Sequence, residues 1–158
     1  MNATKDLSAA YAAGHDELGP IDLVVIAFPP GAPMTGEGAD LLMDLVEKGI
    51  IRVLDAMFVQ KSEDGSFSGF EARGLDASTV GDFTVFEGAS SGLLGSEDAA
   101  VAADAIEPGT AAVLILYENT WAAPFAAAVR RNGGVLIDNQ RIPHEDVIAA
   151  LDAIEAAS

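Results

Sequence analysis

The stretch that decides the fold is Ile21-Asp-Leu-Val-Val-Ile-Ala-Phe28, an apolar run in which Asp22 is the only polar residue. An amphipathic helical pattern follows and ends at Gly49, a residue that fits the left-handed position after a helix. Ile50-Ile-Arg-Val-Leu-Asp-Ala-Met-Phe-Val59 then begins at once. This part of the chain therefore predicts a strand, a helix and a second strand.

The same order returns near the end of the chain. Ala111–Tyr117 is the most apolar run, and Trp121–Arg131 has helical spacing with its aromatic residues on one face. A glycine pair follows the helix, and Val135–Ile142 resembles a further strand. Two units of the same kind predict an α/β protein.

The segments between and after these units complete the predicted order. Asp64-Gly65 marks a hairpin turn, so Phe67–Ala72 is expected to return as an antiparallel strand. Ser96 is a good helix cap, and the helix that it begins is expected to end near Ile106. Pro143 opens a last helix, whose expected buried face holds Val147, Ile148, Leu151 and Ile154.

Residues 74–95 are the hardest to interpret. Val80, Phe83 and Phe86 have helical spacing, whereas Phe83 and Val85 also fit a strand by alternation. We expect a short helix here, followed by a loop of small residues.

The complete order predicts an α/β (α+β) fold with a mixed sheet of about five strands. Through Tyr117 the order is β-α-β-β-α-β, the ferredoxin-like plan, and a C-terminal α-β-α follows. We expect residues 1–18 to be an N-terminal tail and residues 19–158 to form a single domain. In the simplest ferredoxin-like sandwich the helices cover one face of the sheet. Strands that are apolar on both faces need cover on both sides, so the extra helices or a second subunit must supply it.

Composition and charge exclude several classes of function. The formal charge of −17 repels nucleic acid and anionic membranes. The chain has no cysteine, which excludes disulfides and thiolate metal sites. It has neither an apolar run of about 20 residues nor the pattern of a secretory signal, so we expect a cytoplasmic protein without membrane insertion.

Four segments resemble a family of small, acidic, uncharacterised bacterial proteins of unknown function, typical of high-GC genomes. They are Gly19–Phe28, Val46–Asp55, Leu93–Asp98 and Tyr117–Arg131. The resemblance extends from Gly19 to Ile154, nearly the whole predicted domain. It implies no activity, because the family has none that can be assigned to a residue.

The best candidate ligand-binding group stands at the end of the second apolar strand. Glu118 can accept a proton or bind a cation, Asn119 can orient a ligand, and Trp121 can stack on it; Asp55 is the fourth candidate. A structural interpretation competes with this one. In it, Asn119 caps the helix, Trp121 fills the core and Glu118 pairs with an arginine.

Charged residues also interrupt the predicted strands. Arg52, Asp55, Asp138 and Arg141 are expected to form structural ion pairs between strands or subunits, because a buried charge is costly without a partner. No catalytic nucleophile motif is present. With two distant histidines, His15 and His144, the sequence predicts no transition-metal site and no cofactor.

Three hypotheses about function follow from the sequence. The first is a non-enzymatic homo-oligomer with a structural, scaffolding or regulatory role. The second is a small-molecule binder or a cofactor-free enzyme, with an apolar cavity near Glu118, Asn119 and Trp121. The third is an acidic adaptor that binds a basic protein partner, because the chain carries a large negative charge.

Overall fold

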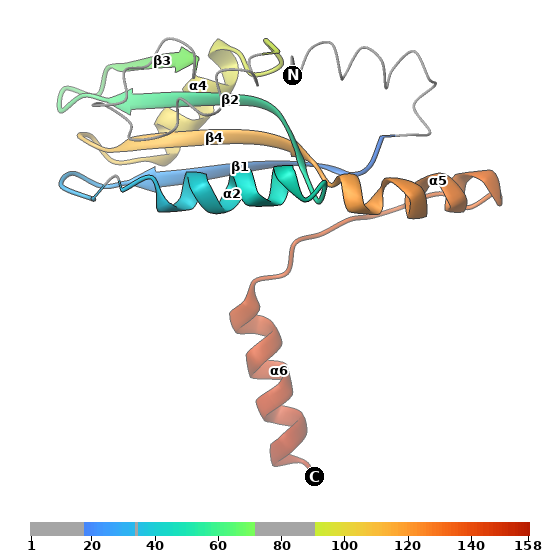
Figure 1. Ribbon diagram of the computed structural model, residues 1–158. Coiled ribbons are helices and arrows are strands. Elements are labelled where there is room, and N and C mark those ends of the chain that lie inside the picture. Colours follow the sequence, from blue (N-terminus) through green and yellow to red (C-terminus); the bar gives the residue numbers. More distant parts are fainter. Residues whose placement is uncertain (1–17, 34, 72–90) are drawn as a thin grey trace.

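The computed structural model describes residues 18–33, 35–71 and 91–158, and Figure 1 shows their arrangement. The short helix predicted around Phe83 lies outside the described residues. The elements in chain order are β1 (Ile21–Phe28), α2 (Glu37–Glu47), β2 (Arg52–Lys61), β3 (Phe67–Glu71), α4 (Ser96–Ala105), β4 (Ala111–Glu118), the short 3-10 helix η3 (Thr120–Ala122), α5 (Ala123–Arg131) and α6 (His144–Ala156).

One open, four-stranded sheet organises the fold. Its strand order is β1-β4-β2-β3, and every neighbouring pair is antiparallel. The α+β class is therefore confirmed. The sheet is not mixed, and neither the ferredoxin-like order nor a fifth strand is confirmed, because residues 135–142 lie outside it.

The two central strands are covered on both faces within a single chain. On one face α2 packs on a core cluster formed by Ala39, Val53, Ala56, Phe58, Val113 and Ile115. On the other face α4 packs through alanines on a second cluster that includes Met57, Val59, Ala112 and Leu114. The side chains of alternate residues of β4 thus face opposite helices. The expectation that C-terminal helices or a second subunit must cover the apolar run Ala111–Tyr117 is wrong, because α2 and α4 cover β4.

A β-bulge interrupts the pairing of β2 with β4. Val53 lies opposite Tyr117 and Asp55 lies opposite Leu116, so Leu54 is an extra residue in β2. A bulge bends its strand and changes which face the following side chains take. Here it places Asp55 on the α4 side of the sheet.

Strand β1 is only partly sheltered. It pairs with β4 along one edge, and Ile21, Leu23 and Val25 are each 46% exposed. The cover on both faces that the apolar pattern calls for is present within the single chain for β4 and is absent there for β1. The reason is the strand order, which places β1 at an edge that α4 does not cover.

The last part of the chain projects from the body of the protein. We call residues 134–158 the C-terminal arm. It comprises an extended segment followed by α6, in which no residue is buried. Figure 1 shows α6 pointing away from the sheet. The predicted buried face of this helix is therefore exposed in the single chain. No helix in the described part of the chain is long and apolar enough to span a membrane.

Candidate functional site

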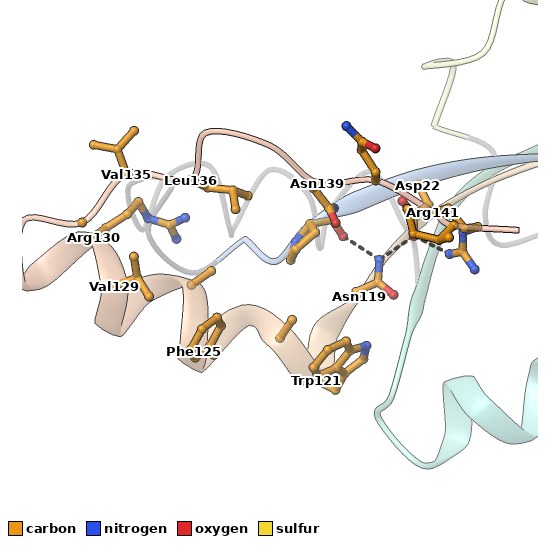
Figure 2. Close-up of a pocket in the computed structure, with 16 residues that line it drawn as sticks. Asp22, Asn119, Trp121, Phe125, Val129, Arg130, Val135, Leu136, Asn139 and Arg141 are labelled. Atoms are coloured by element: carbon orange, nitrogen blue, oxygen red, sulfur yellow. Dashed lines mark hydrogen bonds and ion pairs between the residues drawn. The ribbon is translucent and has the colours of Figure 1, made fainter. Parts of the chain in front are cut away.

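A groove of about 790 Å³ lies between α5 and the extended segment of the C-terminal arm. One wall comes from η3 and α5 and the other from the segment that runs back beside them (Figure 2). The apolar side chains that line it are Trp121, Phe125, Val129, Val135, Leu136 and Ile142.

The wall on α5 follows from the local sequence. Trp121, Phe125 and Val129 are four residues apart, so they share one side of the helical segment. Pro124 is accommodated at the start of α5, where no intrahelical amide bond is lost. Trp121 is 66% and Phe125 is 71% exposed. The aromatic residues therefore line the groove and do not fill the core.

Three polar side chains meet at one end of the groove. The Asn119 side-chain amide donates a hydrogen bond of 2.9 Å to Asp22 and one of 3.1 Å to the carbonyl oxygen of Pro20. Arg141 donates to the same carboxylate at 2.8 Å and to the hydroxyl oxygen of Tyr117 at 2.9 Å. This network joins the start of β1, the end of β4 and the C-terminal arm.

The network fixes the charge of its carboxylate. The hydrogen bond from Asn119 lowers the pKa of Asp22, and the hydrogen bond and charge of Arg141 lower it further, against the opposing effect of burial. In turn the hydrogen bond to Asp22 raises the pKa of Arg141. Both groups are therefore charged at neutral pH, and the ion pair holds the arm against β1.

Two of the four predicted ligand-binding residues lie elsewhere. Glu118 is 2% exposed, receives a hydrogen bond of 2.8 Å from the amide of Gly19 and pairs with Arg52 at 3.0 Å. Asp55 is also buried and accepts hydrogen bonds from the amides of Leu94 and Ala56. Neither lines the groove, whereas Asn119 and Trp121 both do.

The two arginines among the predicted ion-pair residues pair with carboxylates outside that set, and the arginine partner expected for Glu118 is Arg52. Arg52 pairs with Glu118 and Arg141 with Asp22, while Asp138 accepts a hydrogen bond from Gln140. Sequence reasoning missed Asp22 as a site residue. Its signal was present, since it is the only charged residue in an apolar strand.

The lining of the groove suits an apolar occupant with a polar end. Its walls offer aromatic and aliphatic side chains, and the guanidinium of Arg141, at one end, has more N–H donors than the two that it gives to Asp22 and Tyr117. Within residues 18–33, 35–71 and 91–158 no group of three or more histidine or carboxylate side chains is placed to hold a metal ion.

A family model described as "Family of unknown function (DUF6325)" matches residues 17–158. The chain belongs to this family. The resemblance to an uncharacterised family is thereby confirmed, and the DUF6325 match covers every described residue. Neither the search of curated proteins nor the search of solved structures found a match.

Proposed function

We propose that this DUF6325 protein is a non-enzymatic, self-associating protein with a structural or regulatory role. The single observation that carries the proposal is the exposure of α6 along its whole length. This helix has 13 residues and buries none of them. Helices of this length are marginal in water without tertiary packing. A second surface must therefore stabilise it.

The apolar side chains of the C-terminal arm point to the same conclusion. They are exposed from the first residues of the arm to its end, and they comprise Val135, Leu136, Ile137, Ile142, Val147, Ile148, Leu151 and Ile154. Monomeric proteins rarely expose a contiguous apolar patch of more than a few hundred Å². Burial of such surface stabilises an assembly by about 25 cal/mol per Å² before the loss of freedom on association is subtracted.

A second copy of this chain is the first partner to test, because the uncovered surfaces that would meet are apolar. The face of α6 that holds Val147, Leu151 and Ile154 is apolar, as is the uncovered part of β1, so attraction between copies does not depend on opposite charges. Each copy carries a net charge of −17, so the copies repel one another at long range. Added salt screens that repulsion and strengthens self-association. Binding of a basic partner would instead weaken with salt.

Light scattering on the full chain after size exclusion tests the proposal. We expect a mass of at least twice 16.2 kDa at about 10 µM protein, where a stable dimer with a Kd of 1 µM or less is mainly assembled. Replacing Leu151 by glutamate places a charge on the apolar face of α6. It is expected to weaken association about 10-fold or more, because a buried leucine contributes about 1.5–3 kcal/mol.

The matched control is Ala149→Glu, which adds the same charge on the opposite side of α6. Alanine, leucine and glutamate all favour helix, so neither change disrupts α6 itself. We expect Ala149→Glu to retain the mass of the unmodified chain. A full-length chain that is monomeric at this concentration would refute the proposal, as would equal weakening by both variants.

Ligand binding in the groove is a second candidate function, favoured by the position of Trp121 beside Asn119. Trp121 is the only tryptophan in the chain, so intrinsic tryptophan fluorescence reports on this groove alone. Titration with decanoate, an aliphatic chain with a carboxylate, is expected to shift the emission to shorter wavelength. Phe125→Ala should weaken the response several-fold, whereas Phe67→Ala, at an exposed position on β3, should not. An unchanged emission spectrum would exclude this candidate.

A further inference from the structure

We propose that residues 135–142 of one copy pair antiparallel with β1 of a second copy, with Ile142 opposite Ile21 and Val135 opposite Phe28. The inference rests on the proposed self-association and specifies its partner, its surface and its register. In the assembly each sheet then has five strands, and the fifth strand comes from the other copy.

The first observation concerns the edge of β1 that faces away from β4. All eight of its residues pair with β4 on one side, and no described strand pairs on the other side. Its side chains are apolar apart from Asp22. A long apolar edge strand is a template for pairing with another chain, unless charges, proline or a covering element block it. None of the described elements covers this edge.

The second observation is an unpaired segment of matching length. Residues 135–142 also number eight, and four of them are Val, Leu or Ile. Ile137 is 94% exposed. In the part of the chain that the structure describes, no backbone group of residues 135–142 forms a backbone–backbone hydrogen bond. The segment is thus extended and half apolar, and its backbone groups are not paired with the backbone of other described residues, which are the properties that strand addition requires.

The register follows from the ion pair between Arg141 and Asp22, whose atoms are 2.8 Å apart. If these two residues lie opposite each other in an antiparallel pair, Ile142 falls opposite Ile21 and Val135 opposite Phe28. The two eight-residue runs then match from end to end, with Ile137 opposite Ile26. In an exchanged assembly the same ion pair forms between copies, as the contacts of swapped elements do.

The direction of α5 favours the β1 strand of a second copy over that of the same chain. Figure 1 shows α5 continuing beyond the end of the sheet. Gly134 donates a hydrogen bond of 2.8 Å to the carbonyl oxygen of Val129, so the arm starts near the far end of this helix. Within its own chain the arm approaches only the Asp22 end of β1. Val135 would have to start at Phe28, about 23 Å further along at about 3.3 Å per residue.

The exchange also provides a surface for α6. This helix follows the segment after Pro143 and is about 20 Å long at 1.5 Å per residue, so it can lie along about three quarters of an eight-residue strand. Beside the added strand lie Ile21, Leu23 and Val25, the half-exposed side chains on the face that α4 leaves open. The apolar face of α6 and the uncovered side of β1 then cover each other.

Disulfide trapping between two singly substituted proteins tests the register. The chain has no cysteine, so each introduced thiol is unique. The Ala27→Cys protein is mixed with the Leu136→Cys protein, and the two are allowed to exchange subunits and are then oxidised. The Ile26→Cys and Ile137→Cys proteins, which test the neighbouring pair of positions, are treated in the same way. All four positions are exposed. One pair is the closer, non-hydrogen-bonded kind that suits a disulfide. We expect it to form a mixed disulfide, identified by mass spectrometry of the linked peptides.

The control combines Ala27→Cys with Val135→Cys, which is one residue out of register and faces the other side of the sheet. It is expected to cross-link at least 5-fold more slowly. If Ala27→Cys and Leu136→Cys in one chain form only an intrachain disulfide, the exchange between copies is wrong. An oligomer in light scattering without either mixed disulfide would overturn the exchange and leave the proposed function intact. A monomer would refute both.

Discussion

Replacing Glu118 by alanine is expected to lower the free energy of unfolding by about 3–5 kcal/mol. The carboxylate is buried, and it accepts hydrogen bonds from the Gly19 amide and pairs with Arg52. Among the described residues the Nε of Arg52 is buried without a hydrogen-bond partner, so this guanidinium depends on Glu118. Its removal leaves a partly buried cation and a backbone amide uncompensated. Urea unfolding followed by circular dichroism measures the loss.

The unfolding experiment needs one fixed protein concentration, because association stabilises the folded state. Glu107→Ala removes an exposed carboxylate and is expected to change the free energy of unfolding by no more than about 0.5 kcal/mol. Combining Glu118→Leu with Arg52→Met replaces both charges by apolar groups and should recover part of the loss. A loss below about 1 kcal/mol for Glu118→Ala would show that the pair does not stabilise the fold.

The second large effect is expected from Leu114→Ala, which should destabilise the protein by about 3 kcal/mol. Leu114 lies in the central strand β4, is 1% exposed and belongs to the cluster beneath α4. The facing residues of α4 are Ala99, Ala102 and Ala103, whose short side chains cannot extend to fill a cavity. The site therefore relaxes little, and the cavity persists. Urea unfolding again provides the measurement.

Leu41→Ala is the matched control for this change, because Leu41 lies on α2 with 63% of its surface exposed. The same chemical change there is expected to alter stability by about 0.5 kcal/mol or less. Equal effects at both positions would contradict the assignment of Leu114 to the core.

The sequence predicted the individual elements well, because their signals are local. The run Ile21–Phe28 is β1 to the residue, and the helix before Gly49 ends where the glycine requires. The order of the strands could not be derived in this way. It depends on which strands pair across long separations. The run of β4 is the most apolar and is central, but the apolar run of β1 carries no local signal that this strand lies at an edge.

The candidate site was predicted in part for a related reason. Asn119 and Trp121 follow an apolar strand, a position that favours ligands, and both line the groove. Glu118 belongs to the same run but is buried between β1 and β2 because β4 is central. The arm could not be placed, since the apolar pattern of α6 indicates that something covers this helix and does not identify the covering surface.

The extra residue in β2 determines which face of the sheet holds the buried charged side chains. Arg52 and Asp55 are three positions apart, so a regular strand would place them on opposite faces. Because Leu54 is an extra residue, Arg52 and Asp55 instead lie on the same face. There Arg52 pairs with Glu118, and Asp55 accepts a hydrogen bond from the amide of Leu94. On the opposite face, the buried members of the cluster under α2 are all apolar. That layer can therefore accept exchanges among aliphatic residues of similar volume without disturbing any buried ion.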